Sequence, residues 1–67
     1  MAPVERMAMR VKAWRERRGL TQEQLAEKAG ISRGFLARLE TARHDPKLST
    51  LEKIAKALKV DIAKLLK

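Results

Sequence analysis

The sequence LTQEQLAEKAGISRGFLARLE, residues 20–40, decides the fold of this chain. It holds two short segments of helical periodicity separated by a turn at Gly30, a residue type that adopts a positive φ without steric cost. Thr21 and Gln24 have the spacing of a capping box at the start of the first segment, and Ser32 is placed to cap the second. Two short helices joined by a tight turn that contains glycine are typical of a helix-turn-helix.

Apolar residues occupy the positions that would fill the space between these two helices. Ala26 is small, so the second helix can cross close to the first. The second helix, predicted over Arg33–Thr41, would not be stable in isolation because it is so short. It therefore depends on packing by the apolar residues of both segments, which are Leu25, Ala29, Ile31, Leu36 and Leu39.

Three further helices and no strand are predicted around this unit. The first covers Val4–Arg18 and is ended by Gly19. Its core stripe at helical spacing is predicted to consist of Val4, Met7, Val11 and Trp14. A short last helix is predicted over Ile62–Leu66, with Asp61 as its cap. The sequence thus predicts one all-α, five-helix domain over residues 1–67.

The helix predicted over Leu48–Leu58 has a clear core face and an ambiguous start. Ser49 and Glu52 have the spacing of a capping box, whereas Asp45 and Pro46 would begin the helix earlier. The core face follows the helical period and consists of Leu51, Ile54, Ala55 and Leu58.

The charge of the chain narrows the classes of partner. Sixteen Lys and Arg face eight Asp and Glu, which gives a net charge of +8 and a pI near 10.7. Such an excess attracts polyanions, nucleic acid first and an anionic membrane surface second. We expect a cytoplasmic protein, because the chain has no cysteine, no signal-peptide pattern and no apolar run of about 20 residues.

Catalytic chemistry is not indicated by the sequence. There is one histidine, no nucleophile–base set beyond chance, no phosphate-binding glycine loop and no plausible metal cluster. We therefore expect no enzyme, no cofactor, no metal and no small-molecule ligand. Regulation would come through concentration, dimerisation or an unidentified protein partner.

The residues named above resemble the helix-turn-helix regulators of the phage-repressor and Cro type, the xenobiotic-response-element family. The resemblance runs from about Val11 to Leu66 and is carried by residues 20–33, Leu36, residues 38–40, Pro46, Leu48, Leu51 and residues 54–60. It implies a compact, lambda-repressor-like five-helix fold, dimeric binding to partly palindromic duplex DNA, and control of transcription. We expect a repressor, although the sequence does not distinguish a repressor from an activator. Two departures stand out, since Ala42 occupies the usual place of a glycine and Gly34 and Phe35 replace polar residues.

The second helix of the motif presents two different sides. Leu36, Leu39 and Glu40 share one side, which should face the core. The other side is small in the middle and basic at its ends, and we expect it to contact bases in the major groove through Arg33, Gly34, Ala37 and Arg38. Phosphates are the alternative partners of the two arginines.

Several polar residues near this helix are candidates for phosphate contacts. Gln22 begins the first helix of the motif, where a phosphate is favoured. The others end the second helix or follow it in a polar loop, namely Thr41, Arg43, His44 and Lys47. Phe35 is expected at the rim, partly buried and with some DNA contact.

Two charged residues share the core sides of their helices. Arg15 lies four residues after Val11, and Glu40 lies four after Leu36. Because a charge that faces a core must be paired, we expect an ion pair between them. The alternative is that both side chains extend to water.

Apolar residues of the last helix could exceed what the core needs. Ile62, Leu65 and Leu66 are crowded into a short segment, so a surplus edge here would form a dimer patch.

Two other functions of the chain stay open, that of a DNA-binding antitoxin and that of a restriction-modification controller. A basic membrane-surface or protein-interaction module is the alternative outside DNA binding, but it leaves the spacing of the two short helices unexplained.

Overall fold

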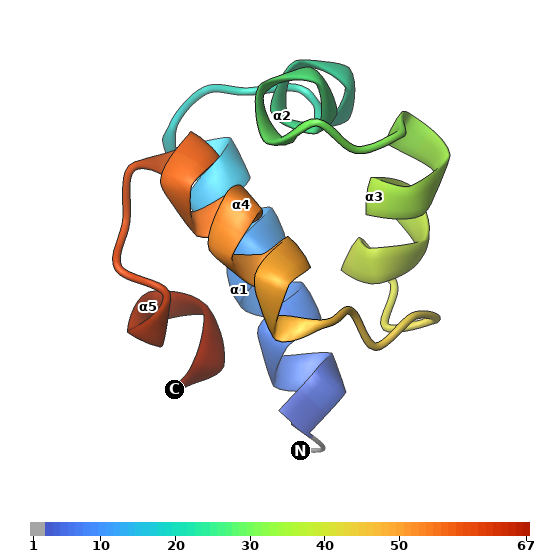
Figure 1. The fold of residues 1–67 in the computed structure, drawn as a ribbon, viewed down its shortest axis with the longest axis vertical. Helices are drawn as coiled ribbons and strands as arrows, with labels where there is room; N and C mark the ends of the chain where they lie inside the picture. Colours follow the sequence, from blue (N-terminus) through green and yellow to red (C-terminus); the bar gives the residue numbers. More distant parts are fainter. Residues whose placement is uncertain (1–2) are drawn as a thin grey trace.

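The computed structural model describes residues 3–67 and has five helices (Figure 1). They are α1 (Pro3–Arg17), α2 (Gln22–Ala29), α3 (Arg33–Glu40), α4 (Leu48–Leu58) and α5 (Ala63–Leu66). The all-α, five-helix fold expected from the sequence is therefore confirmed, with each helix end within one residue of its prediction. No helix in residues 3–67 combines the length and the apolar character needed to cross a membrane.

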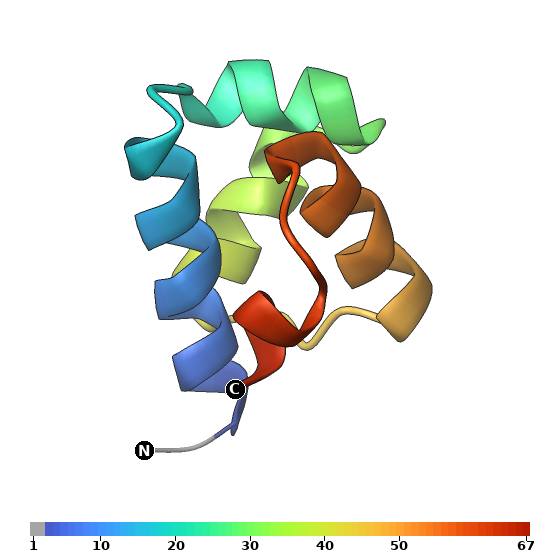
Figure 2. The same ribbon diagram turned by 90° about the vertical axis from the view of Figure 1, so that its left-hand side faces the viewer.

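The helices surround one apolar core. In Figure 1, α2 lies across the top, α3 stands at the right, α4 lies in front of α1, and α5 is at the left. Turning the molecule shows α5 in front and α3 behind, so these two helices lie on opposite sides of the bundle (Figure 2). The largest fully buried side chains come from all five helices and are Val11, Leu25, Leu36, Leu39, Ile54, Leu58 and Leu65.

The core stripe of α1 is shifted slightly from the predicted one. Met7 and Val11 are buried as expected, but Val4 and Trp14 are only partly buried. Ala8 is buried although it was not predicted to be, and Arg15 is buried on the core side as predicted. Trp14 therefore lies at the edge of the core rather than within it.

The start of each short helix in the motif follows its capping chemistry. The N–H of Gln24 donates to Oγ1 of Thr21 at 3.0 Å, and the N–H of Thr21 donates to Oε1 of Gln24 at 2.9 Å, which completes the capping box. The N–H of Phe35 donates to Oγ of Ser32 at 3.0 Å. Both predicted caps are confirmed.

Neither of the two starts considered for α4 is used, so the capping box of Ser49 and Glu52 and the earlier start at Asp45 and Pro46 are both wrong. α4 begins at Leu48 after Lys47, whose extended backbone leads into the helix without a side-chain cap. The carbonyl of Lys47 already accepts the N–H of Leu51, so Ser49 lies inside the first turn and cannot act as a cap. Asp61 does act at the start of α5, where its Oδ1 accepts the N–H of Ala63 at 3.2 Å.

Four helices end in the same left-handed turn, but only two of these turns use glycine. Gly19 and Gly30 have φ values of 70° and 71°, and Ala42 and Lys59 have 61° and 59°. A residue with a Cβ is strained in this conformation. The turn after α3 is therefore strained at Ala42, where the family resemblance implied a glycine.

Candidate nucleic-acid interface

The two sides of α3 differ completely in burial. Leu36 and Leu39 are fully buried on the inner side, and Glu40 is also buried. The outer side carries four exposed residues, Arg33, Gly34, Arg38 and Thr41, with Ala37 partly buried among them. The structure thus brings together on one surface all four residues predicted to contact bases.

Gly34 leaves space beside the guanidinium of Arg38. A Cβ built on Gly34 would have Nη1 of Arg38 as its nearest neighbour outside the helix backbone, at 3.9 Å. Side chains on a helix lean toward its N-terminus, which brings the Arg38 head over the preceding turn. The arginine head groups and the bare backbone at Gly34 therefore share the N-terminal half of α3, the end that enters the major groove in this motif.

The loop between α3 and α4 adds basic side chains next to this surface. Arg43, His44 and Lys47 are all exposed, whereas Pro46 is buried and anchors the loop to the core. The ring of Phe35 is partly buried and meets the ring of His44 edge to face, with the centroids 4.6 Å apart. This contact ties the loop to α3.

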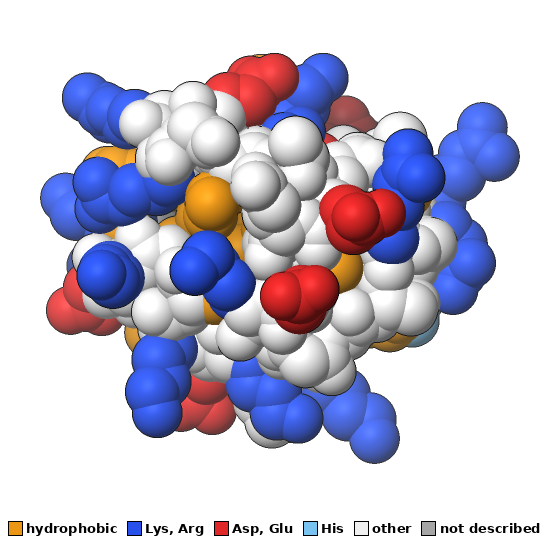
Figure 3. All heavy atoms as spheres, turned by 90° about the horizontal axis from the view of Figure 1, so that it is seen from above, with side chains coloured by type: hydrophobic (Ala, Val, Ile, Leu, Met, Phe, Trp, Pro, Cys, Tyr) orange, Lys and Arg blue, Asp and Glu red, His pale blue; other side chains and the backbone are white. Residues whose placement is uncertain are grey.

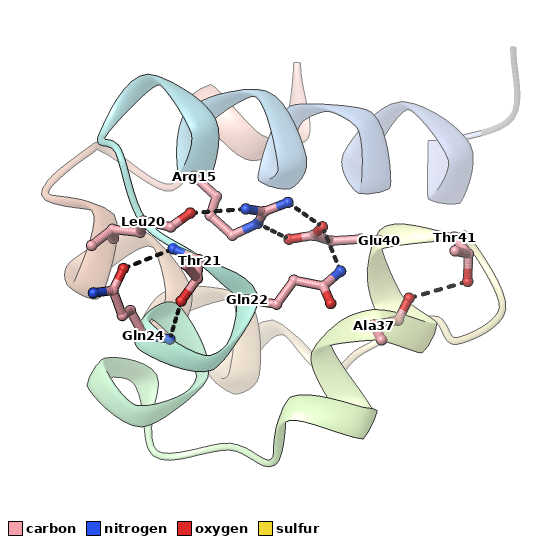
Figure 4. A network of polar contacts seen from close by, with 8 residues as sticks. All are labelled: Arg15, Leu20, Thr21, Gln22, Gln24, Ala37, Glu40 and Thr41. Atoms are coloured by element: carbon pink, nitrogen blue, oxygen red, sulfur yellow. Dashed lines mark hydrogen bonds and ion pairs between the residues drawn. The ribbon is translucent and has the colours of Figure 1, made fainter.

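A buried polar network fixes the orientation of α3 against α1 (Figure 4). Nε and Nη2 of Arg15 donate to the two carboxylate oxygens of Glu40, at 2.8 and 3.1 Å. Nη1 of Arg15 donates to the carbonyl oxygen of Leu20 at 2.8 Å. The ion pair expected from the positions of these two residues is thus present, and no buried side-chain polar atom in residues 3–67 lacks a partner.

The hydrogen bonds from Arg15 to Glu40 also change the pKa of Arg15. They raise the pKa of the Arg15 guanidinium, and this effect outweighs the opposite effect of burial. A raised pKa stabilises the fold below the value of the unfolded chain, and this stabilisation is lost only as the pH rises through the folded value. The Arg15 guanidinium therefore stays charged throughout the neutral range.

Gln22 joins this network, a contact that was not predicted from the sequence. Its Nε2 donates to Oε1 of Glu40 at 3.1 Å, so Glu40 connects α1, α2 and α3. A carboxylate can accept about four hydrogen bonds, and a bidentate contact with a guanidinium fills only two of these sites. That spare capacity is the signal that could have pointed to a second donor. The side chain of Gln22 is thus held at the start of α2.

The hydroxyl of Thr41 is engaged in this structure. It donates to the carbonyl oxygens of Ala37 and Arg38, at 3.2 and 3.0 Å, at the end of α3. A phosphate contact through this hydroxyl would need it to turn away from the helix. Thr41 is nevertheless exposed on the same surface as Arg38.

The predicted dimer patch needs a correction at Leu65. This side chain is fully buried within the chain, because α5 packs closely against α1. Leu66 is 44% exposed and Ile62 is partly buried. Only these two residues of the predicted patch are accessible to a second subunit.

Basic side chains are spread over more than one side of the molecule. Seen from the α2 end, Lys and Arg stand out at the right, where α3 lies, and also at the left (Figure 3). Acidic side chains are fewer and scattered among them. The positive charge is therefore not confined to the surface around α3.

A two-helix motif with a glycine turn, an exposed basic α3 and a basic loop beside it defines the class of helix-turn-helix DNA-binding domains. The chain belongs to the helix-turn-helix family HTH_3 of DNA-binding transcriptional regulators, whose pattern matches residues 11–65. The resemblance noted from the sequence is confirmed by this match. Members of this family are regulators rather than enzymes.

Three similar proteins illustrate the family. The chain is 51% identical over 57 residues to the immunity repressor protein of Bacillus phage phi105. The matched residues make up 85% of this chain but only 40% of the phage protein. The crystal structure of the restriction-modification controller protein C.AhdI from Aeromonas hydrophila superposes with a TM-score of 0.92 at 28% identity, covering 97% of this chain and 98% of that one. The structure of SinR, the master regulator for biofilm formation, in complex with DNA gives a TM-score of 0.87 at 32% identity, covering 91% and 98%.

Proposed function

We propose that this protein is a transcriptional repressor that binds, as a homodimer, to a partly palindromic duplex operator. The observation that carries the proposal is the outer side of α3, where Arg33 and Arg38 are exposed on either side of Gly34 and Ala37. Small residues in the middle allow α3 to sit deep in the major groove. Arginine forks onto the O6 and N7 atoms of guanine and so reads sequence.

The flanking residues hold the protein on the DNA backbone in this proposal. Gln22 at the start of α2, Thr41 at the end of α3, and the loop residues Arg43, His44 and Lys47 contact phosphates. Such contacts fix register and orientation but carry no sequence information. Phe35, tied to His44, contacts the DNA at the rim of α3.

Similarity supports both the DNA partner and the repressor role. SinR, whose structure contains DNA, shares the fold of nearly this whole chain, and the phage phi105 relative is an immunity repressor. The likeness to C.AhdI extends over nearly all of that controller and favours a second candidate function, control of a restriction-modification system. Restriction and methylation genes beside the gene for this protein would decide for the second.

The proposal is tested by selecting bound sites from a random duplex pool and measuring binding to the selected operator. If a dimer touches 6–10 phosphates, the affinity should fall by about 10³- to 10⁵-fold between roughly 50 and 200 mM salt. Sedimentation should show two chains per operator. On a two-fold site their recognition helices would lie about 34 Å apart. A flat salt response would contradict the electrostatic contacts, and one chain per saturated operator would contradict the dimer.

The variants Gln22→Ala and Arg43→Ala distinguish phosphate contacts from base contacts. Each should weaken binding to the operator and to random duplex by the same factor, because phosphates are the same in both. If either variant instead changed the preferred base at one position, its phosphate role would be wrong.

A further inference from the structure

A second basic surface lies on α1, away from α3. It is a groove between the outer side of α1 and α5, called here the α1–α5 groove, and its lining residues are Arg6, Met9, Arg10, Ala13, Trp14, Arg17 and Lys64. Figure 2 shows α5 beside the N-terminal half of α1 and in front of α3, so the groove faces away from the outer side of α3. It is a separate surface from the proposed DNA interface.

The lining of the groove combines positive charge with apolar contact area. Four of its residues are cationic and none is acidic. Within residues 3–67 the only ion pair is that of Arg15 and Glu40, so no carboxylate neutralises the cations of the groove. Among residues 3–67, three large hydrophobic residues are clearly exposed, and one of them is Met9, which is 58% exposed here beside the partly buried Trp14.

The cations of the groove are costly in the free chain. Arg6 and Arg10 are four residues apart on one face of α1, where like charges repel each other. The guanidinium of Arg17 lies 5.0 Å from the centroid of the Trp14 ring, which holds a charge beside the apolar part of the groove. An anionic partner would relieve the repulsion.

We propose that the α1–α5 groove binds an acidic peptide segment of a partner protein, with carboxylates on the arginines and an apolar side chain against Met9 and Trp14. Carboxylates match guanidinium groups in charge and geometry. An exposed methionine adapts to apolar side chains of varied shape. The partner is thus held on the side of the molecule that leaves α3 free for DNA.

Other occupants fit the groove less well. A second copy, joined two-fold through this surface, would place the four cations of one groove against the same four cations of the other. A membrane surface needs a continuous apolar face, but the apolar stripe of α1 is turned into the core at Met7 and Val11. The phosphate backbone of duplex DNA would contact the cations of the groove but offers no apolar group to Met9 and Trp14.

Trp14 provides a direct reporter, since it is the only tryptophan in the chain. The probe is a synthetic peptide in which glutamates flank a leucine and a phenylalanine, labelled for anisotropy. One control peptide has glutamine for glutamate, and another has serine for leucine and phenylalanine. We expect the acidic peptide to bind the full chain and change the Trp14 fluorescence, with both control peptides at least about threefold weaker.

Matched double variants locate the binding. Arg6→Gln with Arg10→Gln should weaken peptide binding about three- to tenfold. Lys53→Gln with Lys56→Gln removes the same charge from a groove between α2 and α4 and should leave binding unchanged. Met9→Ser should weaken binding, whereas Leu48→Ser, at a residue that is 59% exposed outside the groove, should not.

Several results would overturn the proposal. Equal weakening by both double variants would mean general charge attraction. No response up to about 1 mM of any peptide would exclude an acidic ligand. If the Trp14 fluorescence responded to phosphatidylserine vesicles but not to the acidic peptide, the groove would bind a membrane. If random duplex DNA displaced the bound peptide by competing for Arg6 and Arg10, the groove would be a DNA-binding surface. Because peptide binding is measured without DNA, loss of the operator result alone would count against the proposed function and not against this groove.

Discussion

The inner and outer sides of α3, a helix of only eight residues, have different roles. On the inner side, Leu36 and Leu39 are fully buried and Glu40 accepts hydrogen bonds from two other helices. On the outer side, Arg33 and Arg38 are exposed, and within residues 3–67 their side chains form no hydrogen bond. Substitutions on the inner side should therefore change folding, whereas those on the outer side should change binding.

The largest effect is expected on the inner side, at the buried ion pair. Glu40→Ala or Arg15→Ala alone should destabilise the fold by about 3–5 kcal/mol, because each leaves a buried charge without its partner. A domain of this size has a total stability of only about 5 kcal/mol, so either variant should be close to unfolding. Chemical denaturation in a stabilising osmolyte measures the loss.

A double-mutant cycle sharpens this prediction. Arg15→Ala with Glu40→Ala should lose much less than the sum of the single losses, and Arg15→Met with Glu40→Leu should be near neutral. Additive losses would mean that the pair does not interact. A folded Glu40→Ala protein that merely lost operator preference would break the division between the two sides.

On the outer side, Arg33→Ala and Arg38→Ala should leave the free energy of unfolding within about 0.5 kcal/mol of the parent. Each should cost about 1–3 kcal/mol of discrimination at one base pair per half-site, since a bidentate contact to guanine is lost. The measurement is binding to the operator and to every single-base variant of one half-site. Retention of the full preference would reassign the arginines to the backbone and leave specificity to DNA shape or to Phe35.

Gly34→Ala should affect stability and binding in opposite directions. The added Cβ meets only the head of Arg38 at 3.9 Å, so alanine fits and should stabilise α3 by about 0.5–1 kcal/mol. Operator binding should weaken, because the added methyl group holds α3 away from the floor of the groove. Thermal unfolding and operator titration give both values, and unchanged binding would show that Gly34 does not approach the bases.

The smallest effect is expected at the turn where α3 passes into the basic loop. Ala42→Gly should stabilise the fold by about 0.5–1 kcal/mol, because relief of the left-handed strain exceeds the entropy that glycine adds to the unfolded chain. Lys59→Gly is the matched control at the end of α4, with nearly the same φ and an expected gain of the same size. A loss of stability in both would mean that these turns are not strained.

Much of the motif was predictable because its signals are local. Capping boxes, a glycine at the turn and helical periodicity act between residues that are a few positions apart, so Thr21, Ser32 and Gly30 could be assigned directly from the sequence. The pairing of Arg15 with Glu40 was predictable for a related reason. Helical spacing placed both charges on core sides, where a charge requires a partner.

Ser49 shows where local patterns fail. Ser49 and Glu52 match a capping box as well as Thr21 and Gln24 do, yet only the second pair forms one. The start of α4 is fixed instead by the backbone at Lys47 that follows the buried Pro46. Long-range packing of the loop thus set a start for α4 that neither local pattern predicted.

The sequence by itself determined the helices, the motif, the positive charge and which side of α3 is polar, since all of these follow from composition and short-range spacing. Only the tertiary structure decided that Leu65 is buried, that Gln22 reaches Glu40, and that Arg6, Met9, Trp14 and Lys64 share a groove. These facts depend on where α5 docks on α1 and where α2 crosses α3. Such placements result from the packing of residues far apart in the chain, which no local pattern encodes.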